Sequence, residues 1–257
     1  MGSRERPLRR MATTVVALLI ALGGALGGAA RPALAVFQAS VDSNVSAFRP
    51  PCVGFVDSHP AQMLSLAIAG LRTLGYTVSS YSGAAFNHAS VLARAANDAS
   101  FYVHSHGDEY WNSSAQRRYN GFREDSGDCN QAVVFSPEIA AARAGRVANL
   151  VVISTCHNAD PASTLPGAFG IARTKSQDGA RHFYLGYVGI AYDNDEQVFE
   201  KVFWSALKTL SVGEAFDLAA DQNFSHPFEA DWWGTYNWSG FASSASGCTR
   251  CLVGGDR

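Results

Sequence analysis

The chain has 257 residues, a net charge of −2 and 16% charged residues, a charged fraction well below the usual quarter. This length is enough for one large domain with its own buried core. Lysine and arginine are scattered without a basic patch, which argues against a nucleic-acid-binding protein.

The N-terminal segment resembles an export signal. Four arginines within the first ten residues precede an apolar stretch from Thr13 to Ala30, and Ala33-Leu34-Ala35 has the small-x-small pattern of a cleavage site. We therefore expect residues 1–35 to be removed, leaving a secreted or extracytoplasmic protein without stable membrane association. An uncleaved membrane anchor is the alternative, although four glycines weaken the apolar stretch as a spanning helix.

Strand-like and helix-like segments alternate through most of the chain. In order along its first half, we expect a polar lead-in (36–51), a strand (52–56), a helix from Pro60 to Gly75, a strand (76–81), a short helix (87–98), a strand (99–106) and a loop or hairpin (108–131). In order along its second half, we expect a helix from Ser136, a strand (150–156), a long loop (160–180), a strand (182–188), a helix (195–210), a helix (211–221) and an aromatic tail without periodicity.

The expected strands are nearly continuous apolar runs, which is typical of a parallel sheet covered on both faces. The sequence therefore predicts an α/β fold, a three-layer αβα sandwich with a mostly parallel central sheet. We expect the catalytic domain to span 36–222 and a tail that contains cysteines and aromatic residues to span 223–257. Packing of the tail's aromatic side chains onto the domain is the default expectation.

The number of cysteines is odd, at five. In an oxidising compartment four of them can form two disulfides, in three possible connectivities, and one stays unpaired. Cys156 alone follows an apolar strand next to polar residues, so we expect it to be the free thiol. Cys248 and Cys251 lack a second such pair to complete a zinc site, and we expect them to crosslink the tail.

Two of the expected strands end on reactive side chains, one at His106 and the other at Cys156. Because parallel strands end at one edge of a sheet, these groups can meet there. A histidine can activate a thiol nucleophile, and the N–H groups of Gly107 and Cys156 can receive the oxyanion of acyl transfer. His104 or Asp57 could orient His106.

The stretch from Val103 to Glu109 resembles the serine-histidine-glycine-acid-acid stretch of caspases. The run from Leu150 to Cys156 resembles the strand that carries the nucleophile in caspase-like (clan CD) cysteine peptidases, and the histidine precedes the cysteine as in that family. Residues 186–189 and the two helices after them are more similar to bacterial gingipain, clostripain and CHAT-domain relatives. The resemblance covers roughly residues 50–222.

This resemblance implies a thiol protease in which Cys156 is the nucleophile, His106 the catalytic histidine and a thioester the intermediate. The substrate would be a peptide or protein and no cofactor is implied, while a calcium requirement stays open. Caspases have Gln-Ala-Cys-x-Gly where this chain has Ser-Thr-Cys-His-Asn, so we do not expect their aspartate specificity. Relatives that cut after basic residues carry a pocket acid past the next strand, where Asp193 and Asp195 stand; these two also fit a helix cap and first-turn acid.

Two other functions fit parts of the sequence. The motif His104-x-His106-x-Asp108 resembles metal-hydrolase motifs, but Glu109 occupies a position where such motifs need a further histidine. A caspase-like scaffold that binds without cutting is the other alternative, because Thr155 and His157 are unusual neighbours for the nucleophile.

Overall fold

The computed structural model describes residues 37–54, 56–126, 129, 131–171, 182–224 and 238–243. The chain divides into two compact units, Met1–Val36 and Phe37–Arg257. The expected export signal belongs to the first unit and lies outside the described residues.

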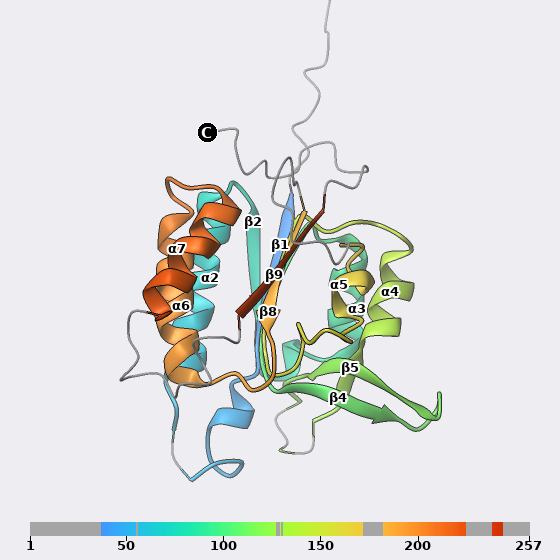
Figure 1. The fold of residues 1–257 in the computed structure, drawn as a ribbon. Helices are drawn as coiled ribbons and strands as arrows, with labels where there is room; N and C mark the ends of the chain where they lie inside the picture. The colour runs from blue at the N-terminus through green and yellow to red at the C-terminus, as the bar shows by residue number, and fades with distance from the viewer. Residues whose placement is uncertain are drawn as a thin grey trace, which may run out of the picture. The chain divides into compact units, whose positions relative to one another are not determined.

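A six-stranded sheet forms the centre of the second unit, in the order β2-β1-β3-β7-β8-β9 (Figure 1). Five strands run parallel, and β9 pairs antiparallel with β8. The strands are β1 (Gln38–Ser43), β2 (Thr77–Tyr81), β3 (Ser100–His104), β7 (Leu150–Ser154), β8 (His182–Tyr187) and β9 (Trp238–Ser243).

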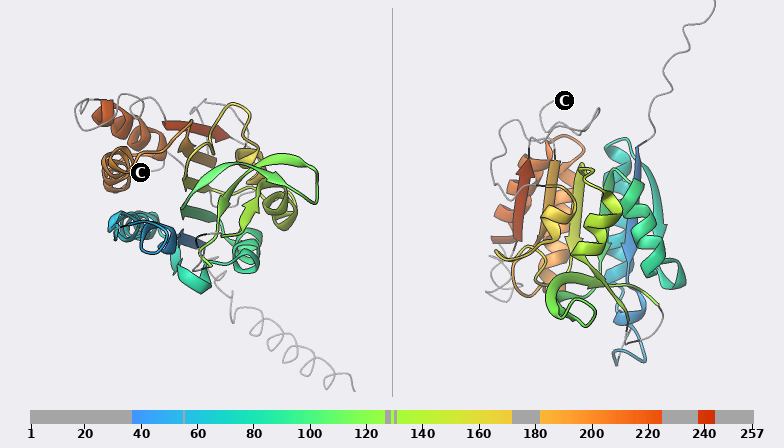
Figure 2. Two further views of the ribbon diagram at one scale, coloured as in Figure 1. Left: turned by 90° about the horizontal axis from the view of Figure 1, so that it is seen from below. Right: turned by 90° about the vertical axis from the view of Figure 1, so that its right-hand side faces the viewer.

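Helices cover both faces of the sheet (Figures 1 and 2). One layer contains α2 (His59–Thr73), α6 (Asp193–Ala206) and α7 (Val212–Phe224). The other contains α3 (His88–Asn97), α4 (Ser136–Arg143) and the short α5 (Leu165–Ala168). The predicted three-layer sandwich with a mostly parallel sheet is confirmed.

Successive side chains of the central strands enter two separate cores, because they point to opposite faces of the sheet. In β7, Leu150 and Val152 join the core under α2, α6 and α7, whereas Val151 and Ile153 join the core under α3, α4 and α5. Both faces are therefore apolar, which explains the continuous apolar runs in the sequence.

The predicted polar lead-in contains the buried strand β1, which lies between β2 and β3. Its Ser40, Asp42 and Ser43 are fully buried, and Asp42 forms an ion pair with Arg94 of α3. The lead-in prediction was wrong because polar side chains occupy core positions of this strand. The strand predicted at 52–56 was also wrong, since Cys52 to Gly54 form turns.

The predicted hairpin after His106 is confirmed and extends into a small antiparallel sheet. This sheet contains β4 (Gly107–Asn112), β5 (Arg117–Arg123) and β6 (Val133–Phe135). The hairpin projects from the carboxyl edge of the central sheet, the lower edge in Figure 1. Two 3-10 turns, η1 (Ser46–Phe48) and η2 (Gly83–Ala85), complete the described elements.

The tail predicted without regular structure contains β9, which extends the central sheet beyond β8. Its pairing is antiparallel, so the chain turns back along the sheet after α7. A single antiparallel edge strand on a parallel sheet is a common arrangement. The prediction of an irregular tail was therefore wrong for residues 238–243.

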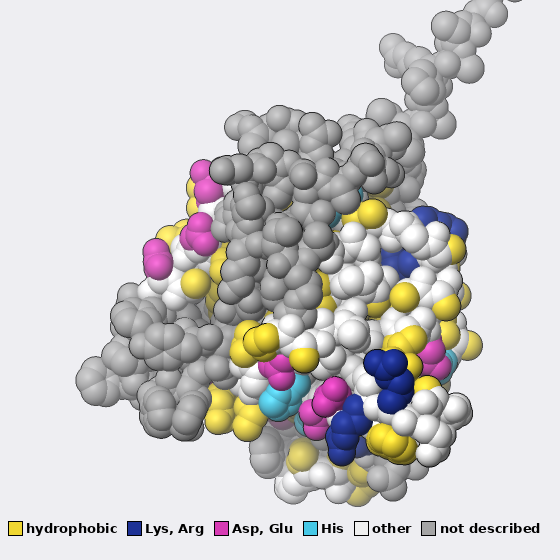
Figure 3. Space-filling model, turned by 45° about the vertical axis from the view of Figure 1, so that its right-hand side comes forward, with side chains coloured by type: hydrophobic (Ala, Val, Ile, Leu, Met, Phe, Trp, Pro, Cys, Tyr) yellow, Lys and Arg dark blue, Asp and Glu magenta, His cyan; other side chains and the backbone are white. Residues whose placement is uncertain are grey.

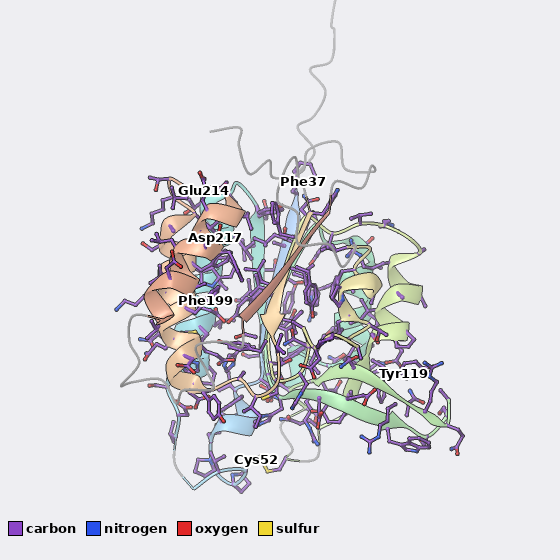
Figure 4. All side chains as sticks on the ribbon, viewed as in Figure 1. Phe37, Cys52, Tyr119, Phe199, Glu214 and Asp217 are labelled. Atoms are coloured by element: carbon purple, nitrogen blue, oxygen red, sulfur yellow. A yellow bond between two sulfur atoms is a disulfide. The ribbon has the colours of Figure 1, made fainter. Side chains whose placement is uncertain are left out.

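A disulfide joins Cys52 to Cys129, whereas Cys156 is a free thiol, as predicted. Figure 4 labels Cys52 at the edge of the unit from which the hairpin projects. Cys248 and Cys251 lie outside the described residues. Among the described helices, none combines the length and the apolar character that crossing a bilayer requires.

Candidate active site

The two reactive strand ends lie next to each other at the carboxyl edge of the sheet. In the parallel pairing of β3 with β7, His104 is opposite Ser154, and the N–H of Ser105 continues the ladder to the Ser154 carbonyl at 3.2 Å. His106 and Cys156 each follow this register pair by two residues. Since paired strands are about 4.8 Å apart, the backbones of the two predicted residues leave the same edge of the sheet from neighbouring strands.

Cys156 lies in a tightly held turn after β7. The Asn158 side-chain amide donates to the Ile153 carbonyl at 2.6 Å and to Thr155 Oγ1 at 2.9 Å. The Tyr184 hydroxyl donates to the Asn158 carbonyl at 3.1 Å. His157 adopts a φ of 59°, a left-handed conformation that non-glycine residues adopt only where the surroundings hold it. The turn therefore fixes the thiol on a rigid support.

The Cys156 thiol is half-buried and close to the start of α6. Its sulfur accepts the N–H of Ala191 at 3.3 Å. Burial raises the pKa of the thiol, and the charges of Glu196 and Asp108 add to this effect, whereas the Ala191 N–H opposes it. The free protein therefore holds a protonated thiol at neutral pH, and attack on a substrate needs a base.

His106 has the properties of such a base. Its ring stacks on Phe48 of η1 with centroids 4.8 Å apart, while the side chain stays exposed. Partial burial against its neighbours lowers the pKa of His106, and Arg123 and His104 lower it further. The imidazole is therefore neutral near pH 7 and able to accept a proton.

Gly107 is packed too closely for any other residue. An added Cβ would lie 2.1 Å from Thr155 Oγ1 and 2.7 Å from the Cys156 carbonyl oxygen. The N–H of Arg123 donates to the His106 carbonyl at 2.9 Å, next to the pair Gly107–Phe122 of the antiparallel ladder. In a regular antiparallel ladder the next pair is not hydrogen-bonded, an arrangement that leaves the N–H facing away from the partner strand, as an oxyanion donor requires.

The two residues expected to orient His106 form other contacts. Asp57 accepts the backbone N–H of His59 at 2.8 Å, at the start of α2. The Nε2 atom of His104 bonds Glu196 Oε2 at 3.2 Å. Phe48 holds the His106 ring instead, and sequence reasoning missed it because η1 lies in the segment expected to be a polar lead-in.

Asp193 and Asp195 both lie in the first turn of α6. Asp193 is exposed, whereas Asp195 is only 1% exposed. Partial burial and the neighbouring Glu196 raise the pKa of Asp193. An open substrate pocket would need exposed side chains, so the burial of Asp195 argues against a role for it there. Both residues are first-turn acids, as the alternative predicted. The expected helix cap was wrong, because the N-cap residue is Tyr192.

The predicted metal motif His104-x-His106-x-Asp108 does not converge. His104 is buried, whereas His106 and Asp108 are exposed. In the part of the chain that the structure describes, the group of possible metal ligands that does converge is His59, His104 and Glu196. His104 bonds Glu196 of α6, whereas His106 stacks on Phe48, so the geometry does not support this motif as one ligand set.

Sequence reasoning missed His59, Glu196 and Glu200, which form a buried polar network with His104. Ser154 Oγ lies 3.1 Å from Glu196 Oε1 and 2.5 Å from Glu200 Oε1. A signal was present, because Glu196 and Glu200 are four residues apart on the face of α6 that carries Phe199 and Phe203. Two acids on a buried helix face indicate a polar site inside the core.

A groove of about 620 Å³ lies between the hairpin, α4 and α5. Its lining is mostly apolar and includes Tyr119, Pro137 and Ala162. Asn120 of β5 connects the groove to the Cys156 turn, since its side chain donates to the His157 carbonyl at 3.2 Å and accepts the Thr164 N–H at 3.1 Å. Figure 3 shows the outer surface on this side, where histidine, acidic and basic side chains gather below an apolar area.

The chain matches no protein-family model, and no curated protein matches it.

Proposed function

We propose that the protein is an exported cysteine endopeptidase that hydrolyses peptide bonds through a thioester, with Cys156 and His106 as the catalytic dyad. The observation that carries the proposal is the register of β3 and β7. In this register the backbones of His106 and Cys156 each follow the pair His104–Ser154 by two residues, and Cys156 carries a free thiol. The resemblance of the two strand ends to clan CD peptidases supports the same assignment.

In the first step, the Cys156 sulfur attacks the carbonyl carbon of the scissile bond while His106 takes the thiol proton. The carbonyl becomes an oxyanion, which accepts hydrogen bonds from the N–H groups of Gly107 and Cys156. The tetrahedral intermediate then collapses, the C–N bond breaks, and the departing amine takes the proton from His106.

In the second step, water attacks the thioester with His106 as the base. The C–S bond breaks, the acid product leaves, and the proton returns to the Cys156 sulfur. No cofactor enters this sequence. It starts from a neutral thiol and a neutral imidazole, which agrees with the raised pKa of Cys156 and the lowered pKa of His106.

A peptide substrate suits the surfaces near the dyad. Ile190, next to the Ala191 whose N–H bonds the Cys156 sulfur, is 51% exposed, and Trp111, further along β4 from Gly107, is 54% exposed. Exposed apolar side chains offer contact area to an extended peptide. The groove beside the hairpin provides a further apolar surface at the far end of the Cys156 turn.

The test is hydrolysis of a peptide library varied at the residue before the cut. Cys156→Ala should reduce cleavage to background, and His106→Ala should slow it roughly 10²–10⁴-fold, the usual contribution of a general base. His88→Ala is the matched control, because His88 pairs with Glu138 on the surface and should leave the rate unchanged. Equal cleavage by all variants, or no cleavage by the wild-type protein, would contradict the proposal.

A further inference from the structure

The side chains of His59, His104 and Glu196 converge inside the unit, on the α2 and α6 side of the sheet. His59 Nε2 lies 3.0 Å and His104 Nε2 lies 3.2 Å from the same carboxylate oxygen, Glu196 Oε2. One ligand atom from each residue lies within 4.8 Å of the other two. We propose that these three residues form a binding site for a zinc ion.

The separations of the ligand atoms fit zinc. Zinc–nitrogen and zinc–oxygen bonds of about 2.0–2.2 Å in a tetrahedron place the ligand atoms roughly 3.3 Å apart. The separations of the two histidine nitrogens from Glu196 Oε2 fall just below this value, and all three ligand atoms lie within 4.8 Å of one another. Two histidines and one glutamate make a ligand set that zinc uses in proteins, with the fourth position left to water.

The three ligands come from separate elements that the fold holds in place. His59 begins α2, His104 ends β3, and Glu196 lies in the first turns of α6. The second oxygen of Glu196 bonds Ser154 Oγ, which leaves Oε2 turned toward the histidines. Such outer contacts orient the ligands of protein metal sites.

A second layer of hydrogen bonds supports Ser154. The Tyr102 hydroxyl and the Trp204 indole N–H each donate to Glu200 Oε2 at 2.9 Å, and Glu200 in turn bonds Ser154. All these groups are buried. The carboxylate that faces the histidines is therefore held by an ordered chain of hydrogen bonds rather than by solvent.

Charge favours a cation at this place. The side chains of His59, His104 and Glu196 are 7%, 1% and 5% exposed. Glu196 pairs with the imidazoles of His59 and His104. An imidazole carries a positive charge only when it is protonated. A divalent ion would compensate the buried carboxylate while both histidines stay neutral. Imidazole ligands favour zinc over calcium or magnesium, which prefer oxygen.

The site is buried and lies between three elements of the fold. Zinc would link the starts of α2 and α6 to the end of β3, directly behind the strand end that leads to His106. The proposal does not depend on the peptidase function, because neither Cys156 nor His106 is a ligand.

The test is equilibrium dialysis of the mature protein against zinc alone, followed by metal analysis. We expect one zinc ion per chain, with at least tenfold weaker binding after Glu196→Gln and after His59→Ala. His88→Ala removes another histidine that faces a glutamate and should bind zinc as the wild type does. Cys156→Ala should also keep the ion, which separates this site from zinc bound at the dyad.

X-ray absorption spectroscopy of the zinc-loaded wild type identifies the ligand atoms directly. This measurement tests the proposal even if a variant fails to fold. The expected spectrum shows nitrogen and oxygen ligands and no sulfur. Absence of stoichiometric zinc at micromolar concentration, sulfur ligation, or loss of the ion in Cys156→Ala would each overturn the proposal. These outcomes leave the peptide-library result unaffected, so failure of one proposal is distinguishable from failure of the other.

Discussion

Gly107 lies at a position in the candidate site where no side chain can be accommodated. A methyl group at this position would collide with Thr155 and with the backbone of Cys156. Because the Cys156 carbonyl is backbone, it cannot simply swing aside. The glycine that follows His106 in the sequence is therefore required by the close approach of β4 to the Cys156 turn.

We predict that Gly107→Ala lowers kcat/KM on order of 10²-fold, the usual loss when an oxyanion donor is displaced. The steric contact moves either the Gly107 N–H or the Cys156 turn away from the substrate. Gly54→Ala is the control, since an added Cβ there meets nothing within 4 Å. Steady-state kinetics on a cleaved peptide checks this, with thermal unfolding to show that the variant is folded. Full activity in Gly107→Ala would rule out the proposed oxyanion site.

The protonation state of Cys156 gives a second prediction at this scale. Only the thiolate reacts with iodoacetamide, and burial raises the pKa of this thiol. The rate of labelling at Cys156 should therefore keep rising beyond pH ~8.5, the ordinary pKa of a cysteine. Peptide mass spectrometry after timed labelling measures the rate, with glutathione as reference. A plateau near neutral pH would instead indicate a preformed thiolate–imidazolium pair.

At the scale of elements, the sequence predicted the helices whose signals lie within a few neighbouring residues. The periodic apolar face of α6 and the Ser211–Glu214 capping box of α7 were read correctly. Strand β1 was missed because what makes it a core strand is distant in the chain. Asp42 can be buried there only because Arg94, 52 residues away, reaches it. Single-sequence patterns do not contain such pairings.

Asp42 also makes stability depend on pH. Burial raises its pKa from 3.8 to about 7, although Arg94 opposes the shift. The folded state thus binds the proton more tightly than the unfolded state does. The resulting stabilisation is fully present below pH 3.8 and is lost as pH rises through about 7.

We predict that the wild type loses up to about 4 kcal/mol of unfolding free energy relative to Asp42→Asn between pH 4 and pH 8. The relevant quantity is the change with pH, because loss of the Arg94 ion pair affects the variant at every pH. Urea titrations at several pH values measure it. Asp217→Asn, on the outer face of α7 (Figure 4), is the exposed control. Parallel pH profiles for the wild type and Asp42→Asn would show that Asp42 is ionised throughout.

At the scale of the whole molecule, the candidate site combines residues that were predictable with residues that were not. His106 and Cys156 each come shortly after an apolar strand, so the sequence pattern singled out both residues. Both strands end at the same edge of the parallel sheet. The buried group of His59, His104 and Glu196 joins residues separated by up to 137 positions. Neighbouring residues in the sequence reveal nothing of that contact, because it arises only when α2 and α6 pack on the same face of β3.

The disulfide between Cys52 and Cys129 closes a loop across 77 positions of the chain. Its removal by Cys52→Ser with Cys129→Ser should lower the unfolding free energy by about 2–5 kcal/mol, mainly because the unfolded chain becomes less restricted. Urea titration measures the loss. Thiol titration of the single variant Cys52→Ser is the control, and it should reveal one additional free thiol, at Cys129. A new thiol at Cys248 or Cys251 would show a different pairing.

The most direct test of the central claim is to trap the acyl-enzyme. A peptide ester built on the preferred library sequence is mixed with the wild-type protein, the reaction is stopped in acid within one turnover, and digested fragments are weighed. We predict an acyl group on Cys156, joined as a thioester that hydroxylamine removes, and none in Cys156→Ser at this stage of the reaction. Turnover of the ester with an acyl group on another residue, or with none on Cys156, would contradict the assignment of Cys156 as the nucleophile.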